Sequence, residues 1–434
     1  MCWYSEKGIN MISIKKSSIQ LLLMALIAFI YPPLGILFLV YQLFQTKWDR
    51  DTYISPNYAV FIALVIAALG YHFYGNATDL YTYIDRINAI QGWSLSDVYN
   101  TVYFDSKTKL YVIDTLMYMA SKSGNPYLLP WIIGFIDYYI IFYIFLDFRN
   151  RSHNSNWWQL CGLFIMLLGI ATPLDVISNT RCISAYILIS FAAYRELVQK
   201  KKNLTTLILY ILPLWLHTSA IIFIGARLMM YLVRYIGNFT IVLSLFASNL
   251  ITLLHQLASQ IKSDNLIVFM VVEAINQAYL YLSGVDAQFK ARYANDASNI
   301  FTRVTGAIFI ILFIVIIFLQ GQGKKEKGYR HENMVEYIIM VSAFALGSLS
   351  IQLGVFWRYE AIIIFLSPII LLRTLNDDSK IVRQLSYVLL CYALMISLKE
   401  ITNQINWIPM DQLILGFLST NGFEIAARLL RVIM

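Results

Sequence analysis

The sequence predicts an all-α, polytopic integral membrane protein, with about 10–13 transmembrane helices joined by short loops. Hydrophobic residues make up 59% of the 434 residues and charged residues 13%, whereas charged residues are about 25% of a soluble domain. The mean hydropathy is +0.63. The apolar runs are long enough to cross about 30 Å of hydrocarbon as helices, and they lack the alternation of barrel strands, so helices are the expected spanning elements.

A single transmembrane domain is expected to cover the whole chain, 1–434. The longest polar-rich intervals, 76–109 and 259–300, are too short to form a soluble catalytic domain. The formal charge is +8, but the basic residues cluster in short loops between apolar runs, as the positive-inside rule predicts. This distribution argues against nucleic-acid binding.

No spacing typical of a metal centre occurs in the sequence, and no cofactor is expected. A nucleophile elbow and a phosphate-binding loop are also missing from it. The cysteines, three of which lie in apolar runs, are interpreted as free thiols and not as a disulfide framework or a zinc site: Cys2, Cys161, Cys182 and Cys391.

The first apolar run, 19–44, is expected to be a retained first span. It follows a pair of lysines, but it is long, contains Pro32 and shows no small-residue cleavage pattern. Translation from Met1 and from Met11 both remain open.

Loops dense in Lys and Arg mark the expected cytoplasmic side: 148–154, 199–203, 323–331 and 373–383. Two helices fit between the first two of these loops, and two between the last two. The turns 173–181 and 354–360 must therefore lie on the opposite side. If 47–51 is cytoplasmic, a helix over 57–75 carries 76–86 to the same outer face, so three polar segments meet there.

Two outer loops are expected to carry helices of their own. The loop 76–126 includes a short apolar segment, 108–122, which is interpreted as a re-entrant or interfacial helix because a full crossing would reverse the side of 148–154. The loop 259–301 includes an amphipathic helix candidate over 265–282.

The path of two further segments is left open by the sequence. In 204–262, Arg227 and Arg234 favour the cytoplasmic side, whereas a single crossing from the preceding basic loop would place them outside. The C-terminal segment 411–434 is either an interfacial helix or a last crossing.

Arg181 and Arg358 lie at the outer boundaries of apolar helices, where a charged side chain usually faces a cavity or the headgroups. Each arginine alone could snorkel to lipid phosphate or pair with a carboxylate. As a pair on one face they could instead hold an anion, since guanidinium stays charged at any pH and binds phosphate bidentately.

His217 is expected in the outer part of the bilayer, because it follows the basic loop by 15 residues, or about 22 Å of helix rise. Pro213 removes a backbone hydrogen bond and predicts a break in the helix. The alternative is that His217 is an ordinary packing residue.

A further polar group, Asp79, Tyr83, Asp85 and Arg86, is expected on the chain leaving the helix 57–75. One interpretation is an aromatic interface belt with solvated charges. The other is a site in which a carboxylate deprotonates a sugar hydroxyl and tyrosine rings pack on pyranose rings.

Three motifs in this order resemble those of the Wzy/EpsG-type polysaccharide polymerases, the O-antigen polymerase family. They are Asp79, Leu80 and Tyr83, then Asn179 and Arg181 opening a span that ends at the lysines 200–202, then His217, Thr218, Ser219 and Ala220. The resemblance covers residues 60–225, with a weaker echo at Arg303 and around Arg358. Thr82 and Cys182 stand where members often carry arginine and glutamine, respectively.

The resemblance implies a multi-pass glycosyltransferase of the bacterial inner membrane with its active site facing the periplasm or exterior. It would transfer a growing glycan from undecaprenyl pyrophosphate to the sugar hydroxyl of a lipid-linked repeat unit, with membrane lipids and a chain-length regulator protein as further partners. The catalytic residues implied are Asp79, Arg181 and His217. The substrate-binding residues implied are Tyr83, Arg86, Arg303 and Arg358.

Two other functions remain open. An O-antigen ligase-like transferase would use the same donor, but ligases typically have a larger outer loop than 259–301. A lipid-linked oligosaccharide flippase should show two related halves with charge spread through both, whereas the polar segments here gather at one face.

Overall fold

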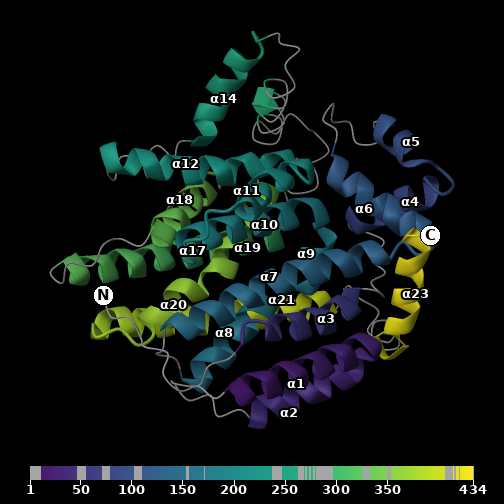
Figure 1. The fold of residues 1–434 in the computed structure, drawn as a ribbon. Helices are drawn as coiled ribbons and strands as arrows, with labels where there is room; N and C mark the ends of the chain where they lie inside the picture. The colour runs from purple at the N-terminus through teal and green to yellow at the C-terminus, as the bar shows by residue number, and fades with distance from the viewer. Residues whose placement is uncertain are drawn as a thin grey trace.

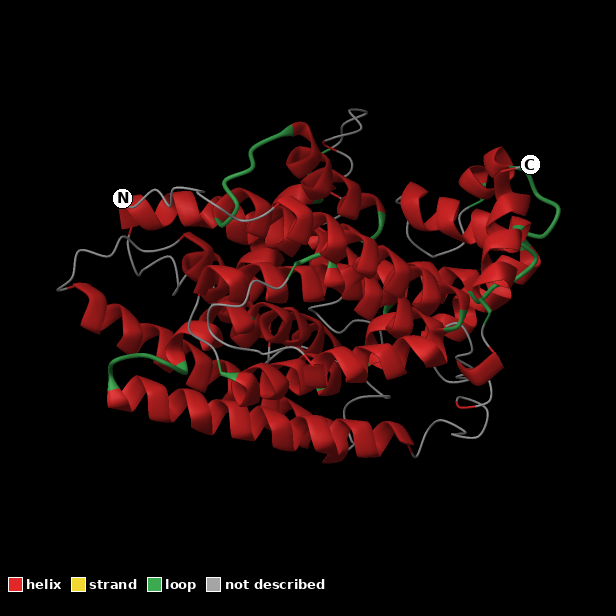
Figure 2. Cartoon of the chain, turned by 60° about the horizontal axis from the view of Figure 1, so that its bottom comes forward, coloured by secondary structure: helices red, strands yellow, loops and turns green. Residues whose placement is uncertain are grey.

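The computed structural model describes residues 11–45, 55–70, 79–101, 110–152, 156–170, 172–236, 247–261, 297–325, 333–348, 353–405 and 421–433, with single positions and pairs between 268 and 279 and a few between 414 and 419 (Figure 1). Every regular element in these residues is a helix, and Figure 2 shows no strand among them. The predicted all-α class is confirmed.

Within the described residues, three helices are long and apolar enough to cross a membrane by length and composition: 128–151, 304–321 and 380–402. In the first helix, 72% of the apolar stretch is buried within the protein, whereas the buried share of the apolar stretch is 33% in the second helix and 39% in the third. The helix at 128–151 therefore lies in the centre of the bundle, and the other two lie at its periphery.

The central bundle consists of α3 (Tyr58–Gly70), α7 (Leu128–Ser152), α8 (Trp157–Gly169), α10 (Thr180–Leu197), α17 (Ala297–Lys325), α18 (Asn333–Ser348), α19 (Leu353–Leu366), α20 (Pro368–Thr374) and α21 (Lys380–Ile405). Small residues let these helices approach closely: a Cβ on Gly134 of α7 would lie 3.6 Å from the Cα of Ala67 in α3. Such contacts are a principal source of helix association in lipid.

The first apolar run forms two helices instead of the single span that the sequence predicts for 19–44. α1 (Met11–Ile30) ends before Tyr31, and α2 (Pro32–Gln45) begins with a proline, which the first turn of a helix tolerates because its N–H has no partner there. The two helices lie side by side (Figure 1), and a Cβ on Gly35 would lie 2.9 Å from that of Ala28. The run is therefore a helical hairpin.

Four short helices, which we name the cap, cover one end of the bundle: α4 (Asp79–Ala89), α5 (Leu95–Asn100), α6 (Tyr111–Lys122) and α23 (Gly422–Ile433). They gather at the right of Figure 1, and Figure 2 shows the C-terminal helix at the same end. α6 corresponds to the segment predicted to be re-entrant or interfacial. α23 rises about 18 Å over its 12 residues, so this helix alone is shorter than about 30 Å of hydrocarbon. Most of 411–420 lies outside the described residues, and both alternatives for the C-terminal segment stay open.

The helix break predicted at Pro213 is confirmed. α11 (Leu204–Ile211) gives way to two single-turn 3₁₀ helices, η1 (Leu212–Trp215) and η2 (Thr218–Ala220), before α12 (Ile221–Ile236) begins. Arg227 of α12 pairs with Glu196 at 2.6 Å, and the Tyr210 hydroxyl of α11 donates to the same carboxylate at 2.9 Å. α12 therefore runs back beside the C-terminal end of α10.

The turn predicted around 173–181 contains a short helix of its own, α9 (Pro173–Ser178), directly before α10. α14 (Ala247–Ala258) follows α12 along the chain. Most of the loop 259–301 and of the amphipathic helix expected over 265–282 lies outside the described residues, as do 47–51 and most of 323–331.

Candidate functional site

Arg181, the second residue of α10, contacts Tyr83 of α4. Its Nε donates to the Tyr83 hydroxyl at 2.5 Å, and its guanidinium carbon lies 5.5 Å from the centre of the same ring. Tyr83 is buried and Arg181 is half-buried. The tyrosine therefore holds the guanidinium by a hydrogen bond and by its ring face, and two motifs 98 residues apart meet.

Arg86 lies one turn after Tyr83 on α4 and forms an ion pair with Asp114 of α6. The Nη2 to Oδ1 distance is 2.8 Å, and the two side chains are 4% and 10% exposed. The charge of Arg181 also acts on the Asp114 carboxylate. Asp114 of α6 therefore interacts with an arginine of α4, Arg86, and with the arginine of α10, Arg181.

His217 lies between η1 and η2, where its backbone N–H donates to the Pro213 carbonyl at 2.9 Å and its carbonyl accepts from Ala220 at 3.1 Å. Its Nδ1 is 2.5 Å from the Ser219 hydroxyl, which is 2.6 Å from the hydroxyl of Tyr186 on α10. The His217 and Tyr186 rings also pack edge to face, 6.4 Å apart. These contacts fix the orientation of the imidazole against α10.

Arg358, on α19, lies close enough for its charge to act on this group. Its charge, like that of Arg181, acts on the His217 imidazole. Its neighbour Tyr359 stacks on Tyr186 with ring centres 5.8 Å apart. Two arginines from helices far apart in sequence thus act on one imidazole.

We name this set of six residues the arginine cluster: Tyr83, Arg86, Asp114, Arg181, His217 and Arg358. The cluster residues come from α4 and α6, from the segment between η1 and η2, and from the N-terminal halves of α10 and α19. The charges of Arg181 and Arg358 both act on His217, and two neighbouring guanidinium groups are suited to holding an anion with several oxygens, such as a phosphate or a diphosphate. The sequence predicts five of the six residues as site residues.

Two predicted site residues are placed only by their backbones. Asp79 is the first residue of α4, and Arg303 lies in α17, three residues before Gly306; both side chains are outside the described part of the structure. The i, i+4, i+7 spacing puts Asp79 on the helix face that also carries Tyr83 and Arg86. The assigned roles of Asp79 and Arg303 stay predictions.

The sequence reasoning missed Asp114, Tyr186 and Tyr359. Asp114 could have been noticed as an acid within a short apolar segment that was already expected at the outer interface. Tyr359 directly follows Arg358 in the sequence. Nothing in the local pattern marks Tyr186, whose importance depends on its contacts with Ser219 and Tyr359.

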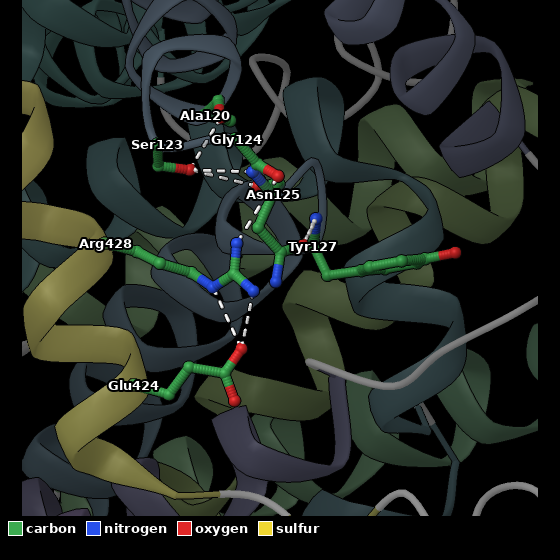
Figure 3. Close-up of polar contacts among 7 residues, drawn as sticks. All are labelled: Ala120, Ser123, Gly124, Asn125, Tyr127, Glu424 and Arg428. Atoms are coloured by element: carbon green, nitrogen blue, oxygen red, sulfur yellow. Dashed lines mark hydrogen bonds and ion pairs between the residues drawn. The ribbon is translucent and has the colours of Figure 1, made fainter.

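The position of α6 is fixed at its C-terminal end by the last helix of the chain. The carbonyl of Gly124, in the turn between α6 and α7, accepts a hydrogen bond from Arg428 of α23 at 3.4 Å (Figure 3). Ser123 and Asn125 bond within the same turn, and Glu424 pairs with Arg428 at 2.6 Å. The helix carrying Asp114 is thus tied to both α7 and α23.

Among the described residues no group of three or more His, Cys, Asp or Glu is placed to hold a metal ion, and Cys161, Cys182 and Cys391 are free. Comparison of the chain with protein-family models, with curated proteins and with solved structures finds no match. The chemistry that the arginine cluster allows is therefore the basis for assigning a function.

Proposed function

We propose that this protein is a polysaccharide polymerase of the bacterial cytoplasmic membrane, which transfers a growing glycan from undecaprenyl pyrophosphate to the sugar hydroxyl of a lipid-linked repeat unit. The observation that carries the proposal is the convergence of Arg181, Arg358 and His217 beside Tyr83. These residues belong to the motifs that resemble the Wzy/EpsG-type polymerases, and their convergence requires four separate helical segments.

The leaving group of this reaction is a lipid diphosphate, whose negative charge increases as the glycosidic carbon–oxygen bond breaks. Guanidinium groups held in place before the reaction stabilise such charge without reorganising. Tyr83 restrains Arg181, while Ser219 and Tyr186 restrain the imidazole. In this account the two arginines bind the diphosphate, His217 orients it, and Asp79 and Arg303 remain candidate acceptor contacts.

The arrangement of the helices supports a site at the outer face of the membrane. The arginine cluster lies beside the cap formed by α4, α5, α6 and α23, whereas the basic ends of α7 and α10 lead into the expected cytoplasmic loops. The return of α12 toward Glu196 supports a cytoplasmic position for Arg227. We propose about 10–13 spans for the whole chain on this basis.

A gel of the host's surface glycan tests the proposal, after the gene has been deleted and then restored on a plasmid. A polymerase predicts that the ladder of chain lengths collapses to single repeat units still attached to their acceptor, and that the restored gene returns the ladder. Loss of all attached glycan, single units included, would instead indicate a ligase or a flippase. An unchanged ladder would contradict all three.

A further inference from the structure

The carboxylate of Asp114 has two unequal oxygens. Oδ1 accepts from Arg86 Nη2 at 2.8 Å, whereas Oδ2 accepts no hydrogen bond from any residue that the structure describes. The side chain keeps 10% of its surface exposed. One oxygen is therefore anchored in a fixed orientation, and the other is left to accept a proton or a hydrogen bond from a ligand.

We propose that Asp114, anchored by Arg86, is the general base that accepts the proton of the acceptor sugar hydroxyl. The inference rests on the proposed polymerase function. The acceptor oxygen forms a bond to the anomeric carbon of the donor while the bond from that carbon to the phosphate oxygen breaks. The diphosphate leaves with the bonding electron pair toward Arg181 and Arg358, and the hydroxyl proton passes to Oδ2 of Asp114.

The surroundings of Asp114 suit this role. Burial raises the pKa of its carboxyl above the usual range, and the charges of Arg86 and Arg181 oppose that rise. A base is most effective when its pKa approaches the working pH while it remains ionised. The titratable side chains that the structure shows interacting with α6 or the turn after it come from four helices: Arg86 of α4, Tyr99 of α5, Arg181 of α10 and Arg428 of α23.

Asp114 also lies near Arg181, as the transfer requires. In a direct displacement that inverts the anomeric carbon, the charge that stabilises the leaving group and the carboxylate that receives the proton flank the same sugar carbon. Arg181 acts on both Asp114 and His217, so the carboxylate and the two-arginine group are neighbours. Asp79, the base expected from the sequence, begins the α4 face that packs on α6 and is the competing candidate.

Asp114 could instead serve only as the counter-ion of Arg86. An experiment must distinguish this structural role from the role of a base. Asp114→Asn alone would remove the carboxylate charge that pairs with the buried Arg86, and this loss could unfold the protein. The double variant Arg86→Gln with Asp114→Asn removes both charges and keeps a hydrogen-bonding pair. Arg86→Gln alone is the reference, because Arg86 itself belongs to the arginine cluster. If Asp114 only balances charge, the double variant extends chains at least as fast as Arg86→Gln; if Asp114 is the base, the double variant is folded and far slower than Arg86→Gln.

The assay uses membrane vesicles of the deletion strain, which contain the host's own lipid-linked repeat units, and full-length protein at matched amounts. The proposal predicts that Asp114→Asn and the double variant extend chains roughly 10²- to 10⁴-fold more slowly than wild type. Asp114→Glu should recover part of the rate. Asp97→Asn, which changes an exposed acid of α5 and keeps an oxygen at its capping position, should match wild type.

The dependence of the rate on pH gives a readout that a structural role would not change. The wild-type rate should fall as pH decreases through the pKa of Asp114, since the protonated acid cannot accept the hydroxyl proton, and this acidic limb should be missing from the residual activity of the double variant. A folded double variant with near wild-type activity, or one that keeps the limb, would overturn the assignment. Wild-type protein that extends no chains would instead reject the polymerase function itself.

Discussion

The Nε atom of Arg181 donates a hydrogen bond to the Tyr83 hydroxyl at 2.5 Å, although the two residues are 98 positions apart in the chain. The bond joins the start of α10 to a short helix of the cap, and the guanidinium also lies over the tyrosine ring. Arg181 is therefore held by Tyr83 in two ways, through its Nε–H and through the ring face. Substitutions at these two residues therefore test separately the charge of Arg181, the planar shape of its guanidinium, and the hydrogen bond that restrains it.

Arg181→Lys should keep the charge and lose both the fork and the bond to Tyr83. Chain extension should fall roughly 10²- to 10³-fold, as when one donor to a developing negative charge is removed. Arg195→Lys is the matched control, because Arg195 lies at the opposite end of the same helix and donates to Thr206 and Asn203. The rate is measured in vesicles, and near-normal extension by Arg181→Lys would disprove the role of Arg181 in binding the diphosphate.

Tyr83→Phe should keep the ring beneath the guanidinium and remove only the acceptor of its Nε hydrogen bond. The loss of about 1.4 kcal/mol of restraint corresponds to a tenfold slower rate. Tyr81→Phe provides the control, since Tyr81 lies on the exposed side of α4 with 46% of its surface accessible. Equal effects of the two substitutions would show that the bond to Arg181 does not matter for activity.

Gly169→Ala should destabilise the contact between α8 and α21. A Cβ at this position would lie 2.3 Å from that of Ser397, and overpacking of this kind costs about 1–3 kcal/mol. Gly162→Ala should cost less, because its nearest atom is the flexible end of Leu390 at 3.1 Å. Thermal unfolding in detergent measures both.

The compensating variant for this contact is Ser397→Gly. In combination with Gly169→Ala, Ser397→Gly should raise the melting temperature most of the way back to the wild-type value, because it removes the Cβ and Oγ atoms of Ser397 that clash. Additive destabilisation by the two changes would show that the helices do not meet as described.

Arg428→Ala should loosen the attachment of α23 to the turn after α6. The variant loses the hydrogen bond to the Gly124 carbonyl and the pair with Glu424, together worth about 0.5–1.5 kcal/mol. Arg431→Ala, at an exposed position of the same helix, should unfold at the wild-type temperature. If both variants unfold alike, α23 does not stabilise the cap.

The sequence predicts helices well where one residue decides the local structure. Pro213 lacks an N–H, so a break near His217 can be expected from the residue type alone, and the structure contains it. Pro32 has the same chemistry, but whether the chain continues or folds back after it depends on the packing of Gly35 against Ala28. That contact is a tertiary event, and the single span expected for 19–44 was wrong for this reason.

The candidate site shows the same division. Arg181, His217 and Arg358 could be expected from their depth and charge, because a charged or ionisable group in a membrane helix needs a reason. Asp114 could not be assigned in this way, since its significance comes from Arg86, 28 residues earlier, and from Arg181 of another helix. Pairings between residues this far apart in the chain depend on how the helices pack, and a local sequence pattern does not show that packing.

Reconstitution shows whether this chain itself joins lipid-linked repeat units. Full-length protein purified into liposomes is given lipid-linked repeat units extracted from the deletion strain, and the products are resolved by chain length. If the chain is the polymerase, the products are longer lipid-linked glycans and released undecaprenyl pyrophosphate; Arg181→Lys should reduce both, and Arg195→Lys should leave both unchanged. Repeat units that stay single with the wild-type protein would contradict the proposed function.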